Sequence, residues 1–189
     1  MLPYPSLDAV RDAHENFSDE NSLVESTVQT LFRQFPTNTD PAQVASKVIV
    51  LSQLYSARVL NIHALPLAEH IVAMKIDPLL DQGSAEAVVR ITDCAETRKY
   101  YSFATKYCSW HGPDAFPMWD GNVDEALWAY MKRDGFHRFK RKDLWEYQAF
   151  RDIVRAFQSF YGLTSVNFKA IDEFLWIVGE DLVNPSGSA

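Results

Sequence analysis

The sequence contains few cysteines and no pattern that would bind a metal ion. Its two cysteines, Cys94 and Cys108, are too few for a disulfide framework, and there is no Cys-x-x-Cys pair for zinc or an iron–sulfur cluster. The histidines His63 and His70 are not spaced as ligands on one face of a helix. The seven glycines form no phosphate-binding loop. We therefore expect neither a metal ion nor another cofactor.

Long hydrophobic segments are also missing. No apolar run reaches the ~18 residues that a membrane-spanning helix needs. The first five residues, Met1 to Pro5, lack the charged start and apolar centre of a signal peptide. These absences predict a soluble cytoplasmic protein that has no membrane partner.

The net charge of −7 argues mildly against a nucleic-acid partner, but local patches decide phosphate binding more than the whole chain does. Basic residues cluster between positions 132 and 142, whereas acidic residues crowd the first 40 positions. The cluster consists of Lys132, Arg133, Arg138, Lys140, Arg141 and Lys142. It is interpreted either as a clamp on a nucleic-acid backbone or as a solvated charge run.

Helical periodicity runs through the whole chain, and no alternation typical of a strand is present. Asp40 and Pro41 open the most apolar segment, which predicts a buried central helix. The expected helices cover about 7–17, 21–35, 41–51, 56–74 with a kink or break at Pro66, 84–93, 97–111 as one helix or a helical hairpin, 122–133, 143–162 and 168–180. With 47% hydrophobic residues, the chain predicts one compact all-α domain, residues 1–180, built from two packed lobes, followed by a flexible tail, residues 181–189.

The segment 116–123, Phe-Pro-Met-Trp-Asp-Gly-Asn-Val, places one carboxylate at the start of a predicted helix. A helix N-terminus favours negative charge, so Asp120 can stay ionised and face a developing cation. Asp is also a common N-cap residue. The segment alone therefore leaves two interpretations of Asp120, a capping residue and a catalytic carboxylate.

Three segments together resemble the helix-hairpin-helix superfamily of DNA glycosylases. Residues 45–59 are similar to the family's apolar helix and the Leu-Ser-Gln-type turn that follows it, residues 102–107 to the second helix of the hairpin, and residues 116–123 to the segment that holds the catalytic aspartate. Ser102 precedes Asp120 by eighteen residues, which is the family's usual separation between nucleophile position and aspartate. The resemblance covers about residues 40–135.

The resemblance implies cleavage of the N-glycosidic bond of a base flipped out of double-stranded DNA. Asp120 would stabilise the positive charge that builds on the sugar. Ser102 stands where bifunctional relatives have a lysine, which implies a monofunctional enzyme that leaves an abasic site. A bifunctional glycosylase and lyase that uses Lys99 or Lys106 is the alternative, because these lysines lie one helical turn away on nearly the same side.

Further site residues follow from the same resemblance. Gln53 matches the residue that fills the gap left by the flipped base, with Tyr55 beside it. The hairpin turn of the family is rich in glycine, whereas residues 95–101 contain none, so Arg98 and Lys99 would replace its phosphate contacts. The DNA-binding candidates are Gln53, Tyr55, Arg58, Arg98, Lys99, Asn122, Arg138, Lys140 and Arg141.

The predicted base pocket draws on aromatic side chains near the catalytic segments. The candidates are Tyr100, Tyr101, Trp110, His111 and Trp119. Aromatic residues at helical spacing are more often part of a core, so one or two of these are expected to touch the base. A four-cysteine cluster and a separate base-recognition domain, which some family members have, are absent from this sequence.

Several functions stay open at this level. An oxidised purine, an adenine opposite a lesion and a modified base of phage DNA are all possible substrates, and the role would be base excision repair or defence against phage. A monomer is expected. The alternatives are a catalytically inactive DNA-binding module of the same fold and a helical scaffold for another protein.

Overall fold

The computed structural model describes residues 2–55, 59, 61–94 and 99–184. It divides the chain into two compact units. Unit 1 comprises Met1–Glu20 and Pro117–Ala189, and unit 2 comprises Asn21–Phe116. The described residues form helices and connecting segments without any strand, so the predicted all-α class is confirmed. The segment of about 40–135 that carries the family resemblance includes residues of both units.

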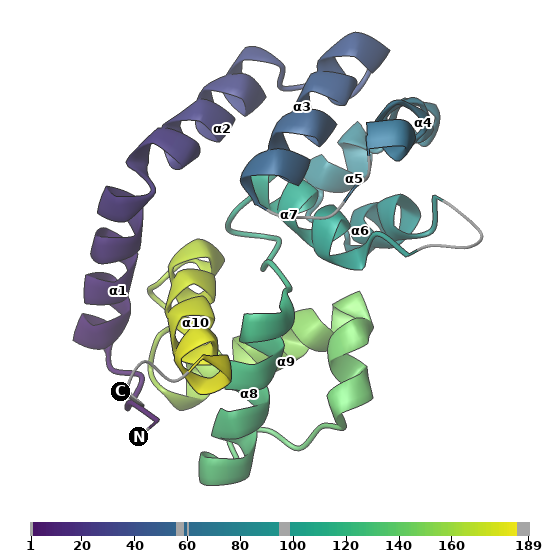
Figure 1. Ribbon diagram of the computed structural model, residues 1–189. Helices are drawn as coiled ribbons and strands as arrows, with labels where there is room; N and C mark the ends of the chain where they lie inside the picture. The colour runs from purple at the N-terminus through teal and green to yellow at the C-terminus, as the bar shows by residue number, and fades with distance from the viewer. Residues whose placement is uncertain (1, 56–58, 60, 95–98, 185–189) are drawn as a thin grey trace. The chain divides into compact units, whose positions relative to one another are not determined.

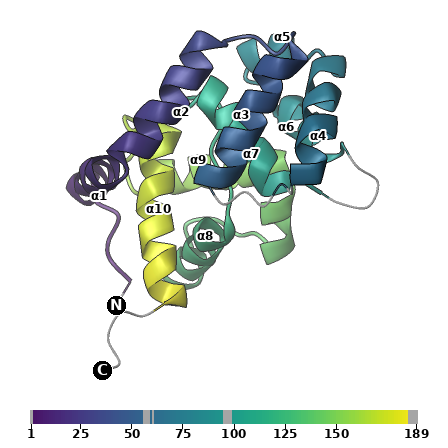
Figure 2. The ribbon, with the colours of Figure 1, turned by 45° about the horizontal axis from the view of Figure 1, so that its top comes forward.

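Unit 2 is organised around its second helix. The helices are α2 (Ser22–Gln34), α3 (Pro41–Leu54), α4 (Asn61–Ala73), α5 (Asp77–Asp81), α6 (Ala85–Thr92) and α7 (Tyr101–His111). Helix α3 lies between α2 and α4 and also packs on α7 (Figures 1 and 2). Val44, Val48 and Leu51 of α3 are fully buried, as expected for the central helix.

Local capping explains where two helices of unit 2 begin. The Asp40 carboxylate accepts hydrogen bonds from the backbone N–H groups of Ala42 (2.8 Å) and Gln43 (3.0 Å), with Pro41 at the first helical position. Ser84 caps α6 by accepting a hydrogen bond from the N–H of Glu86 at 3.3 Å. Both starts agree with the sequence-based prediction.

Several features of unit 2 differ from the prediction. Helix α7 begins at Tyr101, whereas the prediction placed a start at residue 97, and α3 continues to Leu54. Helix α4 continues through Pro66 without dividing. Pro66 is exposed, and so is Ile62 one turn earlier, so water can reach the carbonyl that lacks its helical partner. The short helix α5 was not predicted, because its five residues are fewer than two helical turns and give no periodicity.

Unit 1 contains α1 (Leu7–Glu20), α8 (Gly121–Asp134), the 3-10 helix η1 (Arg141–Trp145), α9 (Tyr147–Phe160) and α10 (Phe168–Val183). Helix α10 lies between α1 and α8 (Figures 1 and 2). The buried carboxylate of Glu173 on α10 is hydrogen-bonded to His14 of α1 and forms an ion pair with Lys169 at 2.6 Å. The contact with His14 helps to hold α1 on α10, whereas the pair with Lys169 lies within α10.

The C-terminal half of the chain corrects two predicted boundaries. The single helix expected over 143–162 is divided, because the extended backbone at Glu146 ends η1 and its carboxylate caps α9. Helix α10 continues to Val183, beyond the predicted start of the tail at residue 181. The remainder of that tail, residues 185–189, lies outside the described residues. Within the described part of the chain, no helix has the length and hydrophobicity needed to cross a membrane.

Candidate functional site

The carboxylate of Asp120 caps helix α8. Its Oδ1 accepts hydrogen bonds from the backbone N–H groups of Asn122 at 2.9 Å and Val123 at 3.1 Å. The side chain is half-buried, and the backbone at Asp120 is extended. The capping interpretation is therefore confirmed, and the cap holds the carboxylate in a defined position at the positive end of the helix. The catalytic interpretation stays a prediction.

Three contacts within unit 1 hold η1 and the start of α9 against α8 and the segment that precedes it. The ring centroids of Trp119 and Trp145 lie 4.2 Å apart. The hydroxyl of Tyr147 donates a hydrogen bond to the carbonyl of Pro117 at 3.2 Å. The third contact is made by Arg141. Together they place the predicted basic segment beside the helix that Asp120 caps.

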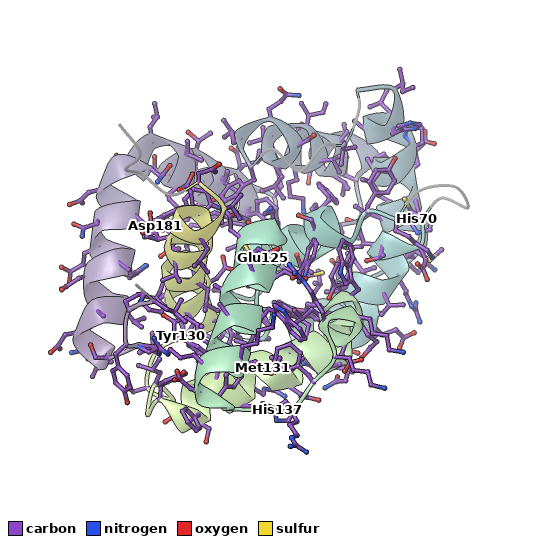
Figure 3. All side chains as sticks on the ribbon, turned by 60° about the horizontal axis from the view of Figure 1, so that its bottom comes forward. His70, Glu125, Tyr130, Met131, His137 and Asp181 are labelled. Atoms are coloured by element: carbon purple, nitrogen blue, oxygen red, sulfur yellow. The ribbon has the colours of Figure 1, made fainter. Side chains whose placement is uncertain are left out.

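Arg141 forms ion pairs with two carboxylates of α8. The Nε of Arg141 donates a hydrogen bond to Asp124 Oδ1 at 2.6 Å, and the Nη2 of Arg141 pairs with the carboxylate of Glu125. Figure 3 labels Glu125 on α8, with Tyr130 and Met131 further along the same helix. Burial raises the pKa of Asp124, and the hydrogen bond and charge of Arg141 oppose this shift. A phosphate at Arg141 would thus compete with these carboxylates, whereas the side chains of Arg138 and Lys140 are exposed.

In unit 2, Ser102 and Lys106 form a hydrogen-bonded pair on α7. Lys106 is buried, and its Nζ donates to Ser102 Oγ at 3.0 Å. Ala104, between them, is fully buried. Lys99 instead has an exposed side chain that pairs with Asp93. Of the two candidate lysines, Lys106 is the one that contacts the predicted nucleophile position.

The other predicted contacts of unit 2 lie in different environments. Gln53 is exposed in the last turn of α3, whereas the hydroxyl of Tyr55 donates to Glu25 Oε1 at 2.6 Å. The predicted DNA contacts Arg58 and Arg98 lie outside the described residues.

Most of the predicted pocket aromatics belong to packed layers. Tyr100, Tyr101 and Trp119 are buried, with at most 6% of their surface exposed. Trp110 is half-buried between Phe32 and Tyr55, with ring-centroid separations of 6.2 and 5.9 Å. This agrees with the expectation that most of the aromatic candidates form core.

A buried lysine in unit 2 was not identified from the sequence. Lys47 of α3 has no exposed surface, and its Nζ donates to the carbonyls of Phe35 and Thr37, both at 3.1 Å, and to Asn38 Oδ1 at 2.7 Å. The backbone N–H and the side-chain amide of Asn38 donate in turn to the carboxylate of Asp77. This network ties the connection between α2 and α3 to the start of α5. A lysine at an inward position of an apolar helix is the only sequence signal that could have indicated it.

His111 completes the Lys47 network. Its Nε2 lies 3.4 Å from Lys47 Nζ, and its ring packs against Phe32 at 4.9 Å and Tyr107 at 5.3 Å. Burial, helped by the charge of Lys47, lowers the pKa of His111 to about 3. His111 is therefore a neutral imidazole at physiological pH, held by packing inside unit 2. Its predicted role as a base reader stays a prediction.

The low pKa of His111 predicts acid sensitivity. In the unfolded chain the imidazole takes up a proton near its ordinary value of 6.5, whereas the folded state does so only near 3. The free energy of unfolding should therefore fall as the pH drops from about 6.5 toward 3, by up to about 1.4 kcal/mol per pH unit from this group. Urea titrations of wild type and His111→Phe across this range measure the difference. The exposed His137, changed to Gln, is the control, and an identical pH dependence of His111→Phe and wild type would contradict the assignment.

Fold and geometry thus define an all-α protein with a carboxylate-capped helix in one unit and a buried lysine–serine pair in the other. The family model HI_0787_N, described as an N-terminal domain, matches residues 8–115. An uncharacterized protein of Haemophilus influenzae is 36% identical over 143 residues, which cover 74% of this chain and 67% of that protein. The chain therefore belongs to the HI_0787_N family. No solved structure matches it.

The described residues contain no group of three or more His, Cys, Asp or Glu side chains arranged to hold a metal ion. The two cysteines are both free thiols, with Cys108 fully buried. Burial raises the pKa of the Cys108 thiol far above its ordinary range, so it is a packed apolar group rather than a nucleophile.

Proposed function

We propose that the protein is a DNA glycosylase that hydrolyses the N-glycosidic bond of a damaged or modified base and leaves an abasic site. The observation that carries this proposal is the Asp120 carboxylate, held at a helix N-terminus by two backbone hydrogen bonds beside a basic segment. Cleavage of the bond builds positive charge on the sugar, and a fixed carboxylate stabilises this charge without reorganising. It can also orient or deprotonate the attacking water. Double-stranded DNA is the proposed partner, in base excision repair or in defence against phage.

Removal of the Asp120 charge tests the proposal. Asp120→Asn is expected to lower base release by about 10²-fold or more, because the amide cannot stabilise the developing cation or accept a proton. The helix start should survive, since Asn is as good an N-cap as Asp. Release of free base and alkali-dependent strand cleavage are measured on duplexes with oxidised, alkylated and mismatched bases and on phage DNA with modified cytosines.

Asp40→Asn is the matched control for Asp120→Asn. Asp40 caps α3 with the same pair of backbone hydrogen bonds and is expected to leave base release unchanged when it becomes Asn. Full activity of Asp120→Asn would reject the assignment of the catalytic carboxylate. No base release by the wild-type protein on any substrate of the panel would reject the proposed activity.

The lysine–serine pair favours a second candidate, a glycosylase with lyase activity. In that reaction the Lys106 amine attacks C1′, the base departs, and the resulting Schiff base permits strand cleavage. Its contact with Ser102 favours Lys106 over the ion-paired Lys99. On DNA with a preformed abasic site, borohydride would then trap a covalent complex with wild type and Lys99→Gln but not with Lys106→Gln. A monofunctional enzyme gives no trapped complex with any of the three.

A further inference from the structure

Trp145 is a large apolar side chain that unit 1 presents to solvent. It is 58% exposed, at the end of η1. Its ring packs at a tilt against that of Trp119, which is only 6% exposed, with 4.2 Å between ring centroids and 53° between ring planes. The neighbouring Tyr147 is anchored to Pro117. Packing against Trp119 thus already restricts the exposed indole, so a ligand that binds to it causes little further loss of side-chain entropy.

The charges around Trp145 are predominantly basic. Between residues 138 and 146 the basic side chains are Arg138, Lys140, Arg141 and Lys142, and the acidic ones are Asp143 and Glu146. Both acidic groups accept hydrogen bonds from backbone N–H groups, Asp143 from Lys140 at 2.8 Å and Glu146 from Gln148 and Ala149. All four basic side chains are exposed, and Arg141 among them is paired with two carboxylates of α8. The surface therefore combines a fixed aromatic face with positive charge.

We infer that this surface binds single-stranded DNA, with a base stacked on Trp145 and the backbone phosphates held by Lys140 and Lys142. Every base has a π-face, so an exposed, backed indole accepts unpaired bases of any sequence, and adjacent cations hold the backbone. A protein partner would also use an exposed Trp, but the exposed cations of the segment that leads into Trp145 favour a polyanion. The inference takes DNA as ligand from the proposed function and adds a site for unpaired bases, such as those exposed when a duplex is opened.

Binding of a labelled single strand tests the inference without any need for turnover. The probe is a fluorescein-labelled oligothymidylate of about 16 nucleotides, the upper end of the site sizes of small single-strand-binding domains. Its anisotropy is titrated with the full chain at several salt concentrations. Trp145→Leu, which keeps an apolar contact on Trp119 but has no π-face, should weaken binding at least about fivefold, and Trp145→Phe should restore part of the loss.

Two controls match these variants. Phe160→Leu removes a 53% exposed aromatic ring from α9 of the same unit and should leave affinity unchanged. Lys140→Gln and Lys142→Gln should each reduce the slope of log K against log salt by about 0.7, whereas Lys132→Gln, whose Nζ lies over the Trp128 ring at 5.0 Å, should not. Absence of binding, or equal affinities of wild type and Trp145→Leu, would overturn the inference.

The outcomes for this site and for the proposed enzyme are separable. Trp145-dependent binding together with no base release from any substrate would support the single-strand site and reject the glycosylase. Base release that is lost in Asp120→Asn would support the glycosylase. If DNA binding in the same experiments does not depend on Trp145, the single-strand site is rejected. Circular dichroism of each variant shows whether it is folded. If every variant that loses binding is also unfolded, and Trp145→Phe is one of them, then Trp145 has a structural role and the inference is rejected.

Discussion

Replacing Gly179 with alanine is expected to unfold unit 1 or to displace α10 from α8. A Cβ atom at this position would lie 1.9 Å from the carbonyl oxygen of Asn122, 2.4 Å from its carbonyl carbon and 2.7 Å from its Cα. All three are backbone atoms in the first turn of α8, so no side-chain rotation can relieve the overlap. We expect the free energy of unfolding to fall by about 4 kcal/mol or more, the range of severe core substitutions. Urea denaturation followed by circular dichroism measures the loss.

Gly121→Ala is the control for Gly179→Ala. Gly121 is the first residue of α8, and a Cβ atom built there has no neighbour within 4 Å. Alanine should therefore leave the stability unchanged or raise it by about 0.4–1 kcal/mol, since it restricts the unfolded chain. Wild-type stability of Gly179→Ala would contradict the close approach of α10 to α8. Because Asn122 donates a cap bond to Asp120, a folded Gly179→Ala protein should also lose the activity that we propose for Asp120.

Local signals in the sequence were sufficient for most of the helices and for three of their caps. Asp40, Ser84 and Asp120 each start a helix where the prediction placed the start, because a cap depends on a carboxylate or hydroxyl and the N–H groups two or three residues later. The division of 143–162 could not be predicted, because the apolar spacing continues across Glu146. Only the extended backbone at Glu146 separates η1 from α9.

Long-range contacts explain what the sequence did not reveal about the candidate site. Trp145 and Tyr147 lie in one aromatic-rich segment, yet Trp145 is exposed and Tyr147 is buried. Arg141 reads as part of a basic run, whereas its carboxylate partners come from α8, sixteen and seventeen residues earlier. In each case the partner is supplied by tertiary packing, which residue spacing does not encode.

Lys47 is the clearest example of a residue whose partners come from tertiary packing. Its replacement gives the second large effect that we expect on the free energy of unfolding. Lys47→Met keeps an unbranched side chain of similar size but leaves the carbonyls of Phe35 and Thr37 without the ammonium donor. The side-chain oxygen of Asn38 also loses it but keeps the hydroxyl of Tyr107 as a donor.

Thr37 is exposed, so water can reach its carbonyl, and the carbonyl of Phe35 is the acceptor most affected. An unsatisfied buried polar group costs about 1–3 kcal/mol, so a loss of about this size in the free energy of unfolding is expected. Ser46→Ala, at the exposed neighbouring position, should change the stability by less than about 0.5 kcal/mol.

The pH dependence identifies the amine as the cause of this loss. Burial lowers the pKa of Lys47 from its ordinary 10.5 to about 8, although the charge of Asp77 opposes the shift. At neutral pH the group is therefore mostly protonated and donates to all three oxygens. Between about pH 8 and 10.5 the unfolded chain keeps the proton that the folded protein has released, so wild-type stability should rise with pH relative to Lys47→Met. A stability difference that is constant from pH 7 to 10, measured by urea denaturation, would show that packing alone accounts for the effect of Lys47.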